Sequence, residues 1–260
     1  LEAHVKGLDV TSAIGIGHTR WATHGEPNDM NAHPHFSESG DMAMIHNGII
    51  ENYATLKEEL VQRGHQFKSD TDTEVLIHLI EDVQKNAGLD LAEAVRVALT
   101  QVVGAYAIVI LSKDSPESLI GAKKGSPMVV GIGENEFFMA SDATPIIEHT
   151  KNVVYLNDEE IVEVTLGEEI KIRNIENEEQ TPYIHELEMH LEEIEKGGYE
   201  HFMLKEIYEQ PRSIADSMRG RINLKKGTVS LGGIIDYEQK ILNAKRIIIV
   251  ACGTSWHAGL

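Results

Sequence analysis

The sequence predicts an α+β fold in which two sheets pack face to face with helices outside. Helical patterns, the last of which stops at Gly104, separate an early pair of strands from a long run of short strands. The run is punctuated by glycine and polar residues and reads AYAIVIL, SLIGAKK, PMVVGIG and EFFMAS, then VVYL, EIVEVT and EIKIRN. Strands, then helices, then strands again favour packed sheets covered by helices.

Two strands open the chain, and each leads into a turn crowded with hydrogen-bonding side chains. In SAIGIG, Ile14 and Ile16 alternate with residues of no bulk, which is typical of a strand packed on one face. The loop after it carries HTRWATHG and closes near Pro27. The second strand, DMAMIHNG, is predicted to end in a turn at His46, Asn47 and Gly48, where glycine frees the backbone to approach a ligand.

Three helices are predicted next. Tyr53, Leu56 and Leu60 lie on one face of the first, which Gly64 ends. Thr71 and Glu74 have the spacing of a capping box, so the residue between them, Asp72, falls in the first turn of the second helix. An acid in that position is favoured by the helix dipole alone, and it can also face a ligand's ammonium group. The third helix is predicted over 90–103, and a short one over DATPIIEHT.

The composition changes near Asn174, where a dense acidic run begins. In this run apolar residues recur at helical spacing and two glycines stop the pattern, which predicts a solvated amphipathic helix at a domain boundary; the residues are Ile184, Leu187, Leu191, Ile194, Gly197 and Gly198. We therefore expect one domain over 1–195, a linker over 196–202 and the beginning of a second domain over 203–260.

The second domain is predicted to open with a helix that begins at Pro211. Its last stretch, RIIIVACGTSWHAGL, has the pattern of a buried strand, a Gly-Thr-Ser turn and the start of a helix. Free backbone N–H groups, two hydroxyls and a helix N-terminus in this arrangement suit a phosphate group.

Charge and composition exclude several classes of partner. The 260 residues hold 23 basic and 42 acidic side chains, a formal charge of −19, which argues against nucleic acid and anionic membrane surfaces as partners. The sequence shows neither an apolar run long enough to span a bilayer nor a signal-peptide pattern. A single cysteine suits a reducing compartment. We expect a soluble, acidic, cytoplasmic protein.

The residue types in the two early turns indicate a binding site for a small zwitterion. The planar fork of Arg20 can hold a carboxylate through two parallel hydrogen bonds. The amide of Asn47 beside the N–H of Gly48 offers two donors to an oxyanion. Together they predict a pocket for a zwitterion whose carbonyl group is attacked.

Four motifs in this order, HTRWATHG, NAHPH, HNGIIEN and SDTDTEV, resemble the glutaminase domain of glutamine–fructose-6-phosphate aminotransferases. KEIYEQP resembles the start of the isomerase half of that family, and ACGTS its first sugar-phosphate loop, so the resemblance covers essentially the whole chain. It implies a four-layer αββα domain of the N-terminal-nucleophile hydrolase type, a class II glutamine amidotransferase, followed by the beginning of an α/β sugar isomerase (SIS) domain.

The resemblance also implies two coupled half-reactions. One cleaves the side-chain amide of glutamine through a thioester and releases ammonia, and the other uses that ammonia to convert fructose 6-phosphate to glucosamine 6-phosphate. Arg20, with Thr23 and His24, is then expected at the glutamine carboxylate, Asp72 at its α-amine, and Asn47 with Gly48 at the oxyanion. Trp21 corresponds to the gate on the ammonia passage, and Thr254 and Ser255 to sugar-phosphate contacts.

The family's nucleophile is an N-terminal cysteine, and residues 1–11 contain none. We therefore expect the chain to be a fragment that lacks the nucleophile segment and most of the isomerase domain, and to be inactive by itself. A natural homologue without glutaminase activity is the alternative. Cys252 follows an apolar run, where a cysteine usually packs as a small hydrophobe, so it is not predicted to be the nucleophile.

The early histidines raise the question of a metal. No cysteine or carboxylate set at zinc spacing accompanies them, so neither a metal nor an organic cofactor is predicted; the five are His18, His24, His33, His35 and His46. The expected ligands are glutamine and fructose 6-phosphate, and the parent enzyme is expected to be a homodimer. Two other functions stay open: another amidotransferase with a cysteine nucleophile, and a non-catalytic regulator that binds glutamine or a sugar phosphate.

Overall fold

A computed structural model describes most of the chain. The described residues are 6–7, 12–20, 24–187, 196–218, 222–223, 227–229, 238–248, 250–251 and 253–260. Internal contacts divide the chain into two compact units, Leu1–Ile194 and Glu195–Leu260. None of the described helices is both long enough and apolar enough to cross a membrane.

A sheet of seven strands forms the centre of the first unit, and all of its neighbouring strands are antiparallel. Its strands, in spatial order, are β1 (His35–Phe36), β2 (Met42–Ile50), β3 (Gly104–Ser112), β4 (Ser115–Lys124), β8 (Glu160–Thr165), β9 (Lys171–Asn174) and β10 (Glu179–Gln180). A second, four-stranded antiparallel sheet has the order β11 (His185–Glu186), β7 (Asn152–Tyr155), β5 (Val129–Ile132) and β6 (Phe137–Ala140).

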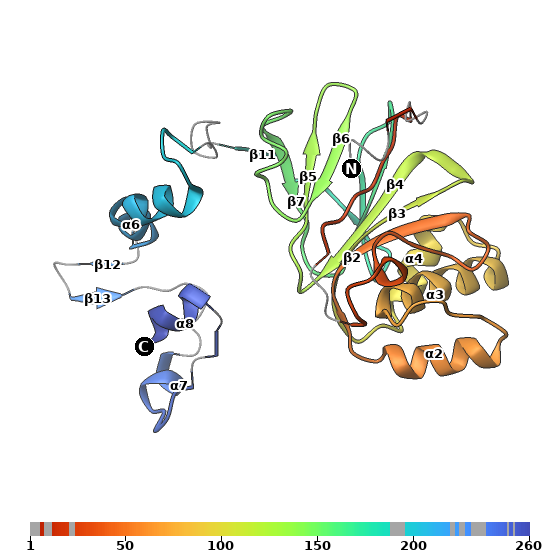
Figure 1. Cartoon of the computed structure of the whole chain (residues 1–260), viewed down its shortest axis with the longest axis horizontal. Coiled ribbons are helices and arrows are strands. Elements are labelled where there is room, and N and C mark those ends of the chain that lie inside the picture. Colours follow the sequence, from red (N-terminus) through yellow and green to blue (C-terminus); the bar gives the residue numbers. More distant parts are fainter. Residues whose placement is uncertain are drawn as a thin grey trace. The chain divides into compact units, whose positions relative to one another are not determined.

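Three helices cover one face of the large sheet (Figure 1): α2 (Tyr53–Gln62), α3 (Asp72–Ala87) and α4 (Leu91–Leu99). The predicted cap of α3 forms, since the hydroxyl of Thr71 accepts from the N–H of Glu74 at 3.2 Å. At the start of α4 the carboxylate of Asp90 accepts from the N–H of Glu93 at 2.8 Å. The carboxylate of Glu74 turns instead to the 68–69 backbone, so the reciprocal half of the capping box is missing. A short 3-10 helix, η1 (Asp29–Asn31), precedes β1.

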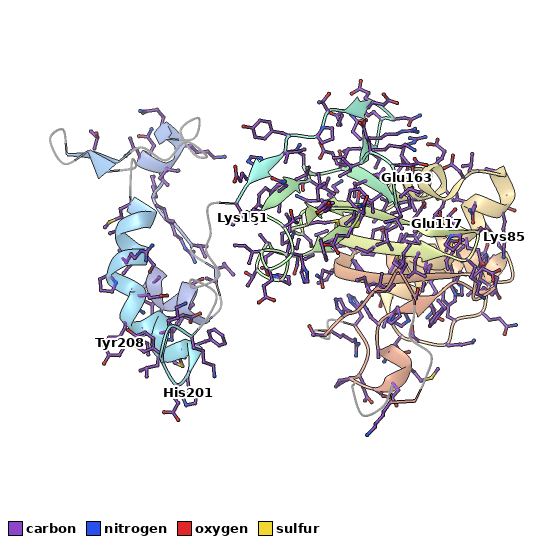
Figure 2. The ribbon with its side chains drawn as sticks, turned by 90° about the horizontal axis from the view of Figure 1, so that it is seen from above. Lys85, Glu117, Lys151, Glu163, His201 and Tyr208 are labelled. Atoms are coloured by element: carbon purple, nitrogen blue, oxygen red, sulfur yellow. The ribbon has the colours of Figure 1, made fainter. Side chains whose placement is uncertain are left out.

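Alternate side chains of β3 serve the two faces of the sheet. Ile108 and Ile110 are buried against the helices, whereas Ala107 and Val109 pack toward the second sheet. Because successive side chains of a strand point to opposite faces, β3 lies between two apolar layers. The described residues therefore form a helix layer, a sheet layer and a second sheet layer, in agreement with the α+β prediction. Lys85 marks the solvent side of the helix layer (Figure 2), its side chain 60% exposed.

The outer face of the second sheet is covered by turns rather than by the short helix predicted there. Ile146 and Ile147 are buried against β5 and β7, but residues 141–149 are bends and turns. Isolated turn hydrogen bonds, such as that from the N–H of Ile146 to the carbonyl of Ala143, do not continue into a regular helix.

Both early elements differ from their predictions. Residues 14–20 do not form a strand. The alternation of large and small side chains predicts which face is buried, but it does not provide a neighbouring strand to hydrogen-bond with. Ile16 still packs on the core between the two sheets. The predicted turn at His46, Asn47 and Gly48 is wrong, because these residues continue β2 and pair with β3, Asn47 opposite Ala107.

The acidic run after Asn174 also differs. Its described part contains the short strands β10 and β11, and Ile184 is exposed rather than placed on an apolar helix face. Leu191 and Ile194 lie outside the described residues.

The second unit contains mostly short elements: α6 (Phe202–Met218), β12 (Ile222–Asn223), β13 (Thr228–Val229), α7 (Glu238–Leu242) and α8 (Gly253–Gly259). Pro211 lies inside α6 instead of opening a helix, and Tyr208 is exposed on the same helix (Figure 2). The predicted buried strand near its end is not observed, since Ile247 and Ile248 are each 66% exposed and Val250 is 91% exposed.

Candidate active site

A cavity of about 300 Å³ lies where four segments of the first unit meet. Its lining comes from the segment that carries His18, Arg20 and His24, from His33 before β1, from the second half of β2 and from the N-terminus of α3. The volume is at the lower end of the range for small-molecule sites, so the cavity suits a ligand of amino-acid size.

Asn47 is held in one orientation by His18. The N–H of Arg20 donates to Nδ1 of His18 at 2.9 Å, so the imidazole proton resides on Nε2, which donates to Oδ1 of Asn47 at 2.7 Å. The Nδ2 amide of Asn47 forms no hydrogen bond with the described residues. Because Asn47 lines the cavity, this oriented amide is available there as a donor.

Gly48, beside it, occupies a position that no other residue fits. Its φ is +127°, and a Cβ built there would meet the carbonyl oxygen of Ala105 at 2.1 Å. The close approach of β2 and β3 therefore requires glycine, and the main chain itself lines the cavity at this point.

The side chain of Arg20 organises the loop after it. Its Nη2 donates to the backbone carbonyl of His24 at 2.8 Å and to that of Gly25 at 3.4 Å. Its Nη1 donates to the backbone carbonyl of Glu26 at 3.3 Å. Arg20 itself adopts φ +44°, in the left-handed region. The guanidinium still lines the cavity, so a positive charge stands at its wall.

The negative charge at the cavity comes from Asp72, in the first turn of α3. Its side chain is 4% exposed, and Oδ2 accepts from the N–H of Ile50 at 2.8 Å. The same oxygen lies 3.9 Å from Nδ1 of His24, a buried atom without a hydrogen-bond partner.

Other histidines complete the wall without adding charge. Thr73 Oγ1 lies 3.0 Å from Nδ1 of His46 and 3.3 Å from Nε2 of His33, and the rings of His33 and His18 stack with centroids 4.4 Å apart. Burial lowers the pKa of His33 to about 3, assisted by the neighbouring histidines, and burial likewise lowers the pKa of His46. Both rings are therefore neutral near pH 7.

The arrangement has the chemistry of a zwitterion site. A guanidinium and a carboxylate border one small cavity, an oriented amide donor is placed on β2, and the rings of His33 and His46 are neutral. Such a cavity can hold opposite charges on a ligand and donate a hydrogen bond to a developing oxyanion.

Five of the residues predicted from the sequence come together here, namely Arg20, His24, Asn47, Gly48 and Asp72. Trp21 and Thr23 lie outside the described residues, as does Cys252. Ser255 is exposed on α8 in the second unit, and the side chain of Thr254 is not described there, so their sugar-phosphate role stays a prediction.

Sequence reasoning assigned no role to His18, Thr73 or His33, although all three line the cavity. His18 and His33 belong to the quoted motifs, but only the fold brings their rings together and places Thr73 between His33 and His46.

Comparison with known proteins gives a consistent result. Residues 4–199 match the family model of the glutamine amidotransferase domain. Over its full length the chain is 59% identical to a glutamine–fructose-6-phosphate aminotransferase (isomerizing) of Bacteroides thetaiotaomicron, covering 42% of that protein. It is 57% identical to the protein of the same name from Chlorobaculum tepidum, over 96% of this chain and 41% of the relative. The chain thus spans about two fifths of the curated relatives it matches.

Among solved structures, the chain resembles the glutamine phosphoribosylpyrophosphate amidotransferase of B. subtilis, determined with ADP and GMP. The TM-score is 0.51 at 25% identity, over 61% of this chain and 34% of that chain.

Proposed function

The chain belongs to the glutamine amidotransferase domain family, and we propose that its cavity binds glutamine for hydrolysis to glutamate and ammonia. We further propose that the chain is the ammonia-producing part of a glutamine–fructose-6-phosphate aminotransferase. The second proposal draws on relatives of which the chain spans about two fifths, at up to 59% identity.

One observation supports the first proposal most strongly: Arg20, Asn47 and Asp72 border the same small cavity. In the proposed mode the guanidinium of Arg20 faces the α-carboxylate of glutamine, and Asp72 faces the α-ammonium group. The charges of the cavity then match the two charges of the amino acid. The side-chain amide is left to reach β2, where Asn47 lies.

Hydrolysis in this mode proceeds through a thioester. A thiolate attacks the amide carbon, the C=O oxygen becomes an oxyanion, and a proton passes to the leaving nitrogen, which departs as ammonia. Water then cleaves the thioester and returns the thiol. The amide of Asn47 and the backbone at Gly48 are proposed to stabilise the oxyanion, a contribution of about 10²–10³ in rate for one such donor.

No cysteine is found among the described residues that line the cavity. The attacking thiol of the proposed reaction therefore has to come from a part of the protein outside the described residues. The resemblance implies an N-terminal cysteine for this role.

The remaining expectations are proposals of the same rank. Fructose 6-phosphate as the ammonia acceptor follows the relatives' names. The complete four-layer αββα fold, the isomerase domain and the homodimer follow from the resemblance, and the cytoplasmic location follows from the composition of the sequence.

The direct test measures glutamate and ammonia formation from glutamine by the full-length protein, with and without fructose 6-phosphate. We expect one ammonia per glutamate in the absence of sugar, and glucosamine 6-phosphate when the sugar is present. Replacing Asp72 by Asn keeps an acceptor for the N–H of Ile50 but removes the charge, so KM for glutamine should rise sharply. Glutamine binding without hydrolysis would favour the regulator instead.

A further inference from the structure

A second cluster of titratable side chains shares no residue with the cavity bordered by Arg20, Asn47 and Asp72, which is called the glutamine cavity below after its proposed ligand. Glu38, His65 and His78 each offer one oxygen or nitrogen atom, and the three atoms lie within 4.8 Å of one another. Glu38 follows β1, His65 follows α2 and His78 lies in α3, so three separate segments converge at this point. The glutamine cavity has none of these residues in its lining.

Both histidines have an unsatisfied nitrogen in a buried position. The side chains of His65 and His78 are 10% and 2% exposed, and Nδ1 of each is buried without a hydrogen-bond partner. Leaving such an atom unpaired is costly, so most buried nitrogens of this kind find a partner.

The opposite edge of the His65 ring meets a carboxylate, since Nε2 of His65 lies 3.3 Å from Oδ1 of Asp82. Nε2 of His78 lies 4.0 Å from Oε1 of Glu74, beyond hydrogen-bond distance. A carboxylate hydrogen-bonded behind an imidazole, as at His65, is the arrangement that orients a histidine toward a metal, because it fixes the tautomer and raises the basicity of the other nitrogen.

Glu38 completes the set. Its Oε1 accepts from the N–H of Gln66 at 3.2 Å, while Oε2 lies 3.1 Å from Nδ1 of His65. The second contact lacks the geometry of a hydrogen bond, since Nδ1 of His65 remains without a partner. Two atoms of a tetrahedral zinc shell stand about 3.4 Å apart, which this pair approaches.

The main chain around Glu38 is fixed as well. The N–H groups of Glu38 and Ser39 donate to the carboxylate of Glu81 at 3.1 and 3.2 Å. A second cavity, of about 480 Å³, has Glu38 and His78 in its lining and provides a route of entry.

We propose that Glu38, His65 and His78 bind a divalent transition-metal ion of the zinc class, with a water molecule as the fourth ligand. Two imidazoles and one carboxylate match the ligand preference of zinc. The ion would join the segments after β1 and α2 to α3, and so stabilise the packing of these three segments. This inference does not depend on the proposed glutaminase function.

The competing arrangement is a protonated His65 held between Glu38 and Asp82 without any metal. It accounts for the contacts of His65 but leaves Nδ1 of His78 unexplained. The two arrangements differ in one measurable property, which is stoichiometric metal binding.

The test is a titration of the metal-free chain with zinc chloride by calorimetry, with metal content measured after dialysis. Cobalt(II) provides a second readout, because tetrahedral cobalt with nitrogen ligands absorbs in the visible range. Glu38→Gln and His65→Gln are the test variants. Glu117→Gln is the matched control, since this glutamate is exposed on β4, a strand that contributes no residue to the cluster.

We expect one zinc per chain in the wild type and in the control. Each test variant should bind zinc at least about 100-fold more weakly, and Asp82→Asn, which alters the carboxylate behind His65, about 10–100-fold more weakly. The proposal is overturned if the wild type binds no zinc or if both test variants bind it as the wild type does. In the latter case the zinc would belong to other histidines.

Discussion

Helix α3 contributes residues to two clusters of histidines and acids, and the clusters differ in the groups that contact the histidine rings. Its first turn gives Asp72 and Thr73 to the glutamine cavity, where the nearby histidines contact a hydroxyl or an amide. Further along, His78 belongs with His65 to a cluster ringed by carboxylates, in which ring nitrogens stay unpaired.

The difference lies in the partners rather than in the histidines. At the cavity the rings of His18 and His46 contact an amide and a hydroxyl, although Nδ1 of His24 and Nε2 of His46 are unpaired there as well, and recognition falls to one cation and one anion. Where a carboxylate stands behind a ring, as at His65, the other ring nitrogen is oriented as that of a metal ligand is. Each prediction below changes one side of this contrast.

The largest effect is expected for Asn47→Ala in the full-length protein. Removing one oxyanion donor should lower kcat for ammonia release by about 10²–10³, with a smaller change in KM. Asn152→Ala is the control, because Asn152 is exposed on β7. Equal kcat values for wild type and Asn47→Ala would remove Asn47 from the oxyanion site.

His18→Ala tests whether the orientation of Asn47 matters. Loss of the hydrogen bond between the two side chains should reduce kcat by about 10-fold, the worth of one such bond, and leave KM for glutamine nearly unchanged. Steady-state kinetics separate the two constants. A change confined to KM would mean that His18 acts on binding and does not position the amide.

Thr71→Ala tests the start of α3, on which Asp72 depends. Loss of the helix cap should lower the free energy of unfolding by about 1–2 kcal/mol, measured by urea denaturation. The control is Thr100→Ala, a hydroxyl at the exposed end of α4. If both variants lose the same free energy of unfolding, the Thr71 cap stabilises the fold no more than the exposed hydroxyl of Thr100 does.

The last prediction concerns pH. The pKa of His33 is about 3 in the folded chain and about 6.5 when unfolded, so the unfolded chain binds the extra proton between these values. The contribution of His33 to the free energy of unfolding is therefore fully present above pH 6.5 and should be lost as the pH drops toward 3. His33→Gln should flatten this dependence between pH 7 and 5, whereas exposed His185→Gln should not; parallel curves for all three proteins would contradict the assignment.

The three helices α2, α3 and α4 and most strands of the first unit could be predicted because their signals are local. Thr71 caps α3 as its spacing predicted, Leu56 and Leu60 are buried on one face of α2, and β3 follows AYAIVIL. For the same reason the residues of the glutamine cavity could be found, since they lie in compact motifs with the chemistry of a zwitterion site.

The failures concern features that depend on distant partners. Gly48 belongs to a continuous strand because Ala105 and Tyr106 approach it from β3, which no local pattern reveals. The apolar run at Ile247 is predicted as a buried strand, yet in the described part of the second unit it lies exposed. The cluster of Glu38, His65 and His78 was not predicted because its members come from three segments and do not have the sequence spacing typical of metal ligands.

The most direct test of the account is the titration of the chain with L-glutamine, followed through the imidazole signals by NMR. Wild type, Asp72→Asn and the control Glu117→Gln are compared at pH 7. The account predicts that glutamine shifts the signals of His18 and His33 in the wild type and in the control, with binding lost in Asp72→Asn. Unchanged glutamine affinity in Asp72→Asn, or shifts confined to histidines outside the cavity, would contradict it.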